Sequence, residues 1–552
     1  MDSPAYQFIC IPELYELLLA QLALERDSRY RQESLTRLAR VSRATSGPAL
    51  DLLWQNITRP SQIIRLLPED AIQHITLGEY RLVRPLEDSD LAVFDKYAPR
   101  VQFVDFSNNF TSLGAGCEFF STLKMLRDPI FPRLLELEWH PSVKFNTVGA
   151  FHLISRRFNV PRDEFSLTLW GNLNARDAAP TSSESQFLTG AGLAETIDLF
   201  QRPLSSWLPD VPGLSINTGN YLTKPAMLEG LQSLSTLQHF HARASGSLGA
   251  EIIVHLAFLP HLKTLHIGNE EERSITVLCE TVTTRGSPSF PALESVEIYG
   301  SYSALNSFLG VITSNFLHSA CLNVTDLHPI DPSIFSLLTT PPARLSTLRH
   351  VLFYTEDRAV AEVGRRALFT MTAFEPLLAC TNLETFDLNV DACEVDFGDR
   401  DLKRIANAWP RLTSLKVFSR YTQQYNWSDP QVHLYTLWTL VEKCRDLRRL
   451  EIAVDARVDG PFTPPPGGAV SGLYAMDKLG FFLSPCGAPT HVADFLNLAF
   501  PHLTDFFAGA PKEETVGYST QVWTQVRDAL PGVDPIWRAL RLAHAPSEFE
   551  TA

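Results

Sequence analysis

A short phrase of leucines recurs along this chain of 552 residues, and it limits the folds that the sequence can adopt. In the copy LPHLKTLHI, Leu259 to Ile267, apolar residues occupy Leu262, Leu265 and Ile267. Leu265 and Ile267 lie two residues apart, so they share one face of a short strand. Pro260 precedes that strand, where its missing N–H does no harm. The phrase therefore predicts a strand with one buried face.

The phrase returns along most of the chain. Good copies lie at residues 132–139, 235–242, 291–298, 346–353, 381–388, 410–417 and 445–452, and weaker copies lie at 99–106 and 501–508. Most intervals are about 24 to 35 residues, which leaves room for one strand, one helix and two turns, as a solenoid repeat needs. The longer interval from Leu293 to Leu348 hides a degenerate copy around Leu322 to Val324.

This repetition resembles the leucine-rich repeat family in its long, irregular, cysteine-containing style, with Cys380 and Cys444 at the start of two copies. The resemblance covers about Ala98 to Gly509. It implies an α/β solenoid in which a curved parallel sheet lines the concave side and helices or irregular turns lie on the convex side. A doubly wound α/β domain with short parallel strands is the alternative fold.

Composition restricts the partners. The net charge of −15 and the pI near 5.5 argue against nucleic acid or an anionic membrane, because both require a basic surface. The eight cysteines form no CxxC pairs, which favours reduced thiols in the cytoplasm or nucleus. The N-terminus has no signal-peptide pattern, and no stretch approaches the roughly 18 apolar residues that a membrane span requires.

Residues 8 to 54 show helical periodicity and form a separate module. We expect a first helix from Pro12, a polar interruption from Glu25 to Glu33, a second helix that Gly47 and Pro48 break, and a short third turn from Ala49 to Trp54. The apolar stripes of the first two helices are Leu14, Leu17, Leu18 and Leu22, and Leu35, Leu38 and Val41. Three short helices make a thin core, so the module should gain stability from a partner packed on it.

The module resembles an F-box, particularly the form common in large fungal families. The resemblance rests on Ile11 to Leu18, Leu35 to Ser42 and Pro48 to Trp54, although Ser42 and Thr45 replace a cysteine and a tryptophan that are frequent in the family. It implies binding to a Skp-type adaptor, which links an F-box to a cullin and a ubiquitin-transferring RING subunit. The implied adaptor-binding residues are Pro12, Leu14, Leu17, Leu18, Leu50 and Trp54. A helical cap on the first repeat is the alternative.

The remaining segments follow from composition. We expect a connector at residues 55–97, repeats at 98–509 and a helical cap or tail at 510–552. Arg176 to Ser185 and Val458 to Gly472 are rich in turn-forming residues and should be surface insertions.

The sequence predicts no catalysis and no cofactor. It contains no phosphate-binding loop, HExxH, GxSxG or paired-cysteine zinc pattern. His239 and His241 could face one metal from a strand, but no acid or cysteine cluster can be assigned beside them, and a surface pair is the preferred interpretation.

Strand alternation predicts where a target protein binds. Val296 and Ile298 should point into the core, so Glu297 and Tyr299 should point to the open face. Applying this offset to other copies gives the expected target-binding residues Tyr299, Tyr354, Asn389, Phe418, His266, Glu297 and Lys416. Rigid aromatic residues on a polar sheet often carry binding energy. The alternative is that these rings only cover the sheet edge or pack under a loop.

The leading hypothesis is a non-catalytic substrate receptor of a cullin-type ubiquitin ligase, whose F-box-like module binds the adaptor and whose repeats bind a target. Three other interpretations stay open: a leucine-rich-repeat scaffold with a helical cap, an F-box protein that acts with the adaptor outside a ligase, and an α/β enzyme without a visible motif.

Overall fold

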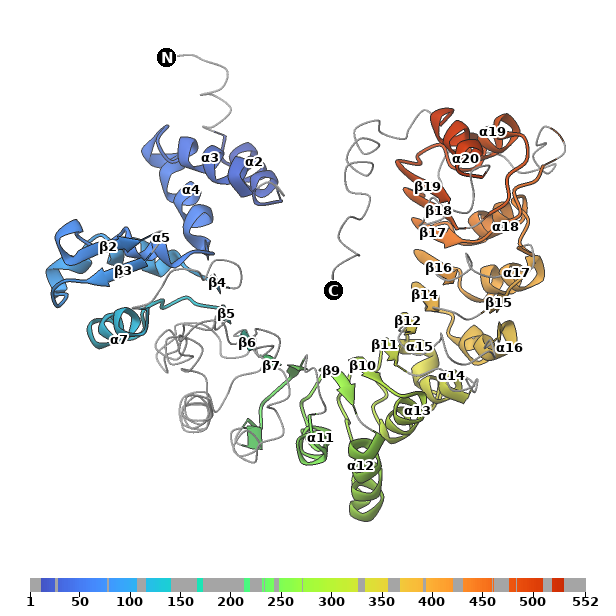
Figure 1. Cartoon of the computed structure of the whole chain (residues 1–552), viewed down its shortest axis with the longest axis horizontal. Coiled ribbons are helices and arrows are strands. Elements are labelled where there is room, and N and C mark those ends of the chain that lie inside the picture. The colour runs from blue at the N-terminus through green and yellow to red at the C-terminus, as the bar shows by residue number, and fades with distance from the viewer. Residues whose placement is uncertain are drawn as a thin grey trace, which may run out of the picture. The chain divides into compact units, whose positions relative to one another are not determined.

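The chain is a mixed α/β protein with a long parallel sheet and accompanying helices (Figure 1). A computed structural model describes residues 11–24, 28–76, 79–106, 116–139, 166–171, 213–218, 231–232, 234–242, 248–270, 272–325, 333–355, 368–390, 394–419, 430–458, 460, 476–482, 484–509 and 519–530. The expected insertions at Arg176 to Ser185 and, for the most part, Val458 to Gly472 lie outside these residues. None of the helices within these ranges is long and apolar enough to cross a membrane.

The chain divides into two compact units within strand β9 (Thr264–Glu270). The first unit contains Met1–Leu262 and His266–Gly268, and the second contains Lys263–Leu265 and Asn269–Ala552. The sequence repeats continue through both units, so the repeat pattern alone gave no indication of this division.

The first unit begins with three helices, α2 (Pro12–Leu24), α3 (Ser28–Leu38) and α4 (Arg43–Gln55). They share a small core in which Tyr15, Leu19 and Leu35 are buried against neighbouring leucines. The Tyr15 hydroxyl donates a 2.8 Å hydrogen bond to the Thr45 carbonyl, which joins α2 to the start of α4. The predicted start of the first helix at Pro12 is confirmed.

Two expected helix boundaries in this module are wrong. The second helix ends at Leu38, and α4 runs through Gly47 and Pro48 instead of breaking there. The break moves to Ser42 because its side chain caps the backbone N–H of Thr45, whose hydroxyl in turn accepts from the Ser42 N–H. This capping box stabilises the helix start, and the helix continues past Pro48 to Gln55. Ser28 already lies in a helix, inside the expected polar interruption.

Past α4, the first unit builds part of the sheet. Its parallel strands are β1 (Asn56–Ile57), β4 (Phe103–Phe106), β5 (Glu136–Trp139), β6 (Ser166–Gly171), β7 (Gly213–Thr218) and β8 (His239–Ala242), paired in that order. The sheet thus begins at Asn56, inside the segment expected to be a connector.

Between and beside these strands lie shorter elements. They are α5 (Pro60–Ile64), η1 (Glu69–Ala71), the antiparallel pair β2 (Ile72–Thr76) and β3 (Glu79–Leu82), η2 (Asp88–Leu91), α6 (Phe94–Tyr97), η3 (Ala98–Arg100), α7 (Gly116–Leu126) and α11 (Ala250–Ala257).

The second unit contains eight parallel strands that pair in chain order among its described residues. They are β10 (Ser295–Gly300), β11 (Ser319–Val324), β12 (His350–Thr355), β14 (Thr385–Val390), β16 (Ser414–Ser419), β17 (Arg449–Ile452), β18 (Lys478–Phe482) and β19 (Asp505–Gly509). Strand β11 confirms the degenerate copy of the repeat around Leu322 to Val324. Strand β18 belongs to a further repeat that the leucine pattern does not predict, because Met476 replaces the first leucine.

Helices lie on one side of these strands (Figure 1). They are α12 (Glu272–Arg285), α13 (Tyr302–Val311), α14 (Ser333–Leu338), α15 (Arg344–Thr347), α16 (Met371–Phe374), η7 (Glu375–Ala379), α17 (Asp399–Ala408), α18 (Thr436–Lys443), α19 (Pro489–Ala499) and α20 (Ser519–Asp528), with a small second pair of strands, β13 (Leu368–Thr370) and β15 (Glu394–Asp396).

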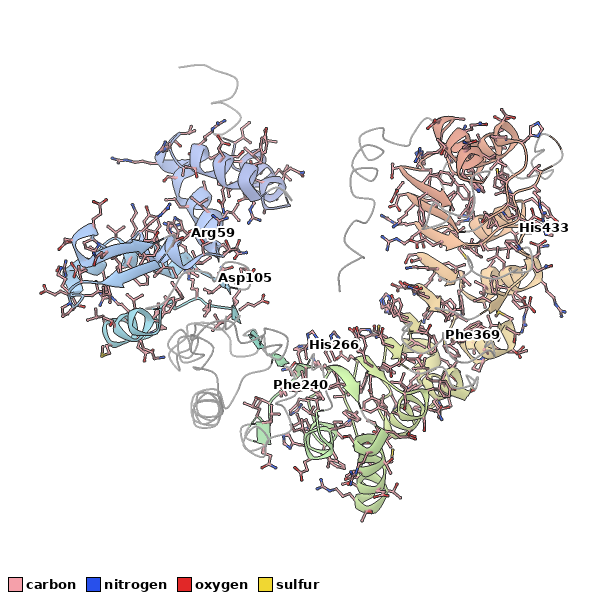
Figure 2. All side chains as sticks on the ribbon, viewed as in Figure 1. Arg59, Asp105, Phe240, His266, Phe369 and His433 are labelled. Carbon is pink, nitrogen blue, oxygen red and sulfur yellow. The ribbon has the colours of Figure 1, made fainter. Side chains whose placement is uncertain are left out.

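Aromatic rings fill the core between these helices and the sheet. Phe369 of β13, labelled in Figure 2, lies with its ring centroid 5.8 Å from that of Phe353 and 6.0 Å from that of Phe374. Phe374 also contacts Phe386 of β14 at 5.4 Å. These contacts link consecutive strands through their buried face, as the repeat pattern predicts.

One backbone contact recurs at every strand start of the second unit. The carbonyl oxygen of the residue just before one strand accepts the N–H groups of two successive residues at the start of the next. The accepting residues are Lys263, Glu294, His318, Arg349, Glu384, Thr413, Arg448 and Asp477, at distances of 2.7 to 3.2 Å. Gln102 does the same for Leu135 and Glu136 in the first unit. We call this series the shared-carbonyl ladder, and it sets the register of each new strand.

A buried arginine ties three turns together in the second unit. Arg344 is fully buried, and its guanidinium donates to the carbonyl oxygens of Ser314 at 2.8 Å, Leu337 at 3.1 Å and Ile312 at 2.6 Å. Burial lowers the pKa of Arg344 to about 10. Among the described residues no carboxylate forms an ion pair with Arg344, and its partners there are backbone carbonyls.

We expect Arg344→Met to lower the free energy of unfolding by about 3 kcal/mol, because three buried carbonyls lose their donors. Urea unfolding followed by circular dichroism measures this loss. The exposed Arg349, which pairs with Glu384 at 3.2 Å, provides the control, and Arg349→Met should cost about 0.5 kcal/mol. Equal losses for both variants would contradict a special role for Arg344.

Candidate functional site

The expected adaptor-binding residues lie on two helices of the module, α2 and α4. Leu17 is 67% exposed, whereas Leu14 and Leu18 are half-buried beside it on α2. Tyr15 and Leu19 are buried in the module core and Leu18 packs against that core, so Leu17 alone of the expected α2 leucines is largely exposed. A leucine in the middle of a helix that remains this exposed lacks the burial that its side chain would gain from a partner. Pro12 begins the helix, and its side chain lies outside the described ones.

The other two expected residues lie on α4, which joins the module to the sheet. Leu50 and Trp54 are half-buried, and the Trp54 ring stacks on Tyr97 with centroids 4.6 Å apart. Arg100 donates to the Gly47 carbonyl at 3.2 Å and pairs with Asp51. Trp54 therefore contributes to the junction with the first strands, and its place in an adaptor interface remains a prediction.

The expected alternation of buried and open residues is present in the second unit. In β10, Val296, Ile298 and Gly300 are buried while the residues between them are half-buried, and β12 and β14 show the same alternation. The parallel register aligns these open positions into rows across the strands. The side of the sheet opposite the helices therefore carries a defined polar surface, which we call the open face.

The middle row of the open face is charged. This central row contains Glu297, Cys321, Leu352, Asp387, Lys416 and Glu451 on successive strands. The Lys416 ammonium lies 3.7 Å from a carboxylate oxygen of Asp387 and 3.7 Å from one of Glu451. Lys478 reaches the second Glu451 oxygen at 3.4 Å. These ion pairs connect four neighbouring strands through their side chains.

A second row beside it alternates aromatic residues with asparagines. This aromatic row contains Tyr299, Asn323, Tyr354, Asn389 and Phe418 in register. The Tyr354 hydroxyl donates to Asp387 at 2.9 Å, and the Tyr299 hydroxyl donates to Glu297 at 3.0 Å. The structure thus brings together six of the seven expected target-binding residues, Tyr299, Tyr354, Asn389, Phe418, Glu297 and Lys416. The side chain of Phe418 lies outside the described ones.

The seventh expected residue, His266, lies apart from these rows. Its ring is 5.0 Å from that of His241 in an edge-on contact, and both residues belong to the first unit (Figure 2). Within the described ranges, no three His, Cys, Asp or Glu side chains are grouped so that they could hold a metal ion. A metal site at His239 and His241 therefore gains no third ligand from the described residues.

Burial changes the acidity of the groups on the open face. Desolvation raises the pKa of Asp387, which outweighs the opposing effect of Lys416 and of the Tyr354 hydrogen bond. Burial and the neighbouring Asp387 charge raise the pKa of Tyr354, so its hydroxyl stays a donor. Burial also raises the pKa of the Cys321 thiol to about 12, which makes it a poor nucleophile. The site is thus suited to binding through hydrogen bonds and charge, and it offers no activated nucleophile.

Sequence reasoning missed part of this site. Asn323 and Cys321 lie on β11, whose phrase is degenerate, so they were not assigned to the open face. Asn323 and Cys321 lie one and three residues before the buried strand end Val324, so alternation from that residue would place both in their rows. The contact between Tyr354 and Asp387 joins neighbouring strands, and it becomes predictable only once their register is known.

We expect Asp387→Asn to raise the stability at neutral pH relative to wild type. A carboxyl whose folded-state pKa is raised disfavours folding when ionised, and this effect disappears below its ordinary pKa of 3.8, where both states are protonated. The difference between variant and wild type should therefore shrink as the pH falls through the raised pKa. Urea unfolding midpoints measured over a series of pH values test this.

Asp455 is a matched control, because its side chain is 14% exposed, as is that of Asp387. Hydrogen bonds from the Arg457 side chain lower the pKa of Asp455. Asp455→Asn should therefore destabilise the protein at neutral pH, with the loss fading as the pH falls. If both variants changed the stability at neutral pH in the same direction, the raised pKa of Asp387 would be contradicted.

Comparisons with known proteins leave the family open. No family profile and no curated protein matches the chain. Solved structures that resemble it include that of Rad7 with Elc1 from yeast, at 12% identity and a TM-score of 0.34, covering 73% of this chain and 85% of that chain.

Two further structures resemble the chain at a similar level. The TLR13–ssRNA13 complex has 13% identity and a TM-score of 0.33, covering 79% of this chain and 55% of that chain. A protein from Bacteroides fragilis has 11% identity and a TM-score of 0.24, covering 59% of this chain and 70% of that chain. The likeness is weak in all three cases, and no functional conclusion rests on it.

Proposed function

We propose that this protein is the target-recognition subunit of a cullin-type ubiquitin ligase. In this proposal the α2–α4 module binds a Skp-type adaptor, and the repeats form a leucine-rich-repeat solenoid whose open face binds a target protein. The subunit itself is non-catalytic and acts in the cytoplasm or nucleus. The proposal rests on the order of F-box-like residues in the module and on the separate polar surface of the sheet.

The observation that carries the proposal is the exposure of Leu17 at 67% on a helix whose other side is packed. Leu14 is half-buried on the preceding turn, the preceding Ile11 is also exposed, and Leu18 packs against the module core. An adaptor helix that covered these side chains would remove apolar surface from water at about 25 cal/mol per Å². This supports a partner for the module, beyond its role at the end of the sheet.

A second candidate is a helical cap without a ligase connection. The observation that favours it is the direct continuation of α4, which ends at Gln55, into β1, which begins at Asn56 and pairs with β4. A cap needs this continuity, because it must cover the first strands. The two functions make different demands on Leu17, which a cap leaves exposed and an adaptor interface buries.

We expect the double variant Leu14→Glu with Leu17→Glu to lose capture of a purified Skp-type adaptor. Charged groups in the interface would remain desolvated without partners, so affinity should fall below detection. The main thermal transition should be unchanged, because neither side chain lies in the buried core. Glu16→Lys, an exposed change on another side of α2, serves as the control and should retain capture.

Capture of the adaptor at the wild-type level by the double variant would leave the module as a cap only. If the adaptor is captured, reconstitution with a cullin, a RING subunit and ubiquitin decides whether the complex transfers ubiquitin or acts outside a ligase. Proximity labelling with and without residues 8–54 then separates adaptor-dependent neighbours from targets of the open face.

A further inference from the structure

The open face carries two tyrosine–carboxylate units of different geometry: Tyr299 and Glu297 share strand β10, whereas Tyr354 on β12 bonds Asp387 on the neighbouring β14. In each unit the hydroxyl of a half-buried tyrosine donates to a carboxylate of the central row, as Tyr299 does to Glu297 and Tyr354 does to Asp387. The hydrogen bond fixes the far end of each ring beside a negative charge. We call these two pairs the aromatic–carboxylate units.

Such a unit favours a basic side chain. A guanidinium or ammonium group binds over a tyrosine face through the ring quadrupole, and a carboxylate beside the ring adds charge attraction. Asp387 has an oxygen, Oδ1, that is buried and accepts no hydrogen bond from the described residues. Its other oxygen, Oδ2, accepts from Tyr354 and lies 3.7 Å from Lys416. A small rotation of this carboxylate would therefore offer an unused acceptor to a cationic ligand.

The distance between the strands that carry the two tyrosines restricts the backbone conformation of a ligand that contacts both rings. Tyr299 and Tyr354 align in register on β10 and β12, with Asn323 of β11 between them, so about 9.6 Å separates their strands. A polyproline II segment advances about 9.3 Å in three residues. A β-strand advances about 6.7 Å between side chains on one side, and an α-helix about 5.4 Å per turn. The polyproline II repeat fits this spacing best.

We propose that the open face binds an extended polyproline II segment of a target protein, crossing the strands, with basic side chains three residues apart on Tyr299–Glu297 and Tyr354–Asp387. This inference rests on the proposed function only in assigning target binding to the open face. It adds the backbone conformation, the charge and the spacing of the recognised segment.

The charges of the central row agree with a basic ligand. The row holds three carboxylates, Glu297, Asp387 and Glu451, and one ammonium group, Lys416. Lys416 and Lys478 lie toward Glu451, so the positive charges gather at one end of the row. The end near Tyr299 and Tyr354 therefore carries the excess of negative charge. Of the two asparagines in the aromatic row, Asn389 is half-buried and Asn323 is buried.

Three synthetic peptides of equal length and charge test the proposal by fluorescence anisotropy with the full chain. The first contains four Arg-Pro-Pro triplets, the second contains the same residues with the four arginines adjacent, and the third contains four Arg-Gly-Ser triplets. We expect the first to bind at least about fivefold more tightly than the other two, because it alone combines the spacing with a stiff backbone. Equal affinities would indicate general attraction to an acidic protein and would overturn the proposal.

Variants locate the site. Tyr354→Ala and Tyr299→Ala should each lower the affinity for the first peptide by about tenfold. Tyr354→Phe keeps the ring, so its loss of affinity should be smaller. Tyr435→Ala removes an exposed tyrosine outside the two rows and should change nothing. Unchanged thermal transitions show that each variant is folded. Binding that survives both alanine variants would overturn the assignment to these rings.

Adaptor capture is measured on the same variants, so the two proposals fail separately. Loss of peptide selectivity with intact adaptor capture rejects only the polyproline II inference. If the wild-type protein captures no adaptor, the ligase role is rejected. Selective binding of the first peptide would then still support the proposed site on the open face.

Discussion

The shared-carbonyl ladder is the constraint on which the rest of the second unit depends. A carbonyl oxygen has two lone pairs, so it can accept from two successive N–H groups, and this happens at each strand start from Lys263 to Asp477. The ladder leaves each strand no freedom to slide by one residue. Because a slip of one residue would exchange the two faces of a strand, the ladder also determines which side chains meet the helices and which form the open face.

The two faces use this fixed register differently. On the buried face, ring contacts run across consecutive repeats from Phe353 through Phe335 and Phe374 to Phe386. On the open face, charged groups are held close together in partly desolvated surroundings, and Asp387 keeps a raised pKa despite a lysine 3.7 Å away. A purely structural sheet surface would be more stable with short neutral residues at such positions.

The sequence predicted the parts of this fold that repeat. Leucine spacing located most strands, and alternation placed Tyr299, Tyr354 and Lys416 on the open face before their register was known. The strand β18 was missed because Met476 broke the leucine pattern while occupying the same buried position. Pro48 predicts a helix break, whereas in the structure the capping box of Ser42 and Thr45 sets the start of α4 upstream of it. Those two residues look like departures from a family pattern, yet locally they are good capping residues.

Contacts between repeats were beyond what one sequence shows. The hydrogen bond from Tyr354 to Asp387 spans different strands, and the Arg344 guanidinium reaches carbonyls some thirty residues upstream, at Ile312 and Ser314. Both depend on how far each turn carries the chain before the next strand begins. The repeat pattern gives the number of residues between one strand and the next, but it does not give the conformation of that segment.

Because α4 passes directly into β1, the junction of module and sheet is sensitive to the insertion or deletion of a single residue. Gln55 ends the helix and accepts from the Gln102 N–H, Asn56 begins the strand, and Ile57 is buried. One residue inserted between Gln55 and Asn56 would either turn Ile57 toward solvent or rotate the helix by about 100° relative to the sheet. A fusion protein that replaces the module with another would therefore have to keep the number of residues between the helix and the strand unchanged, in addition to keeping the helix itself.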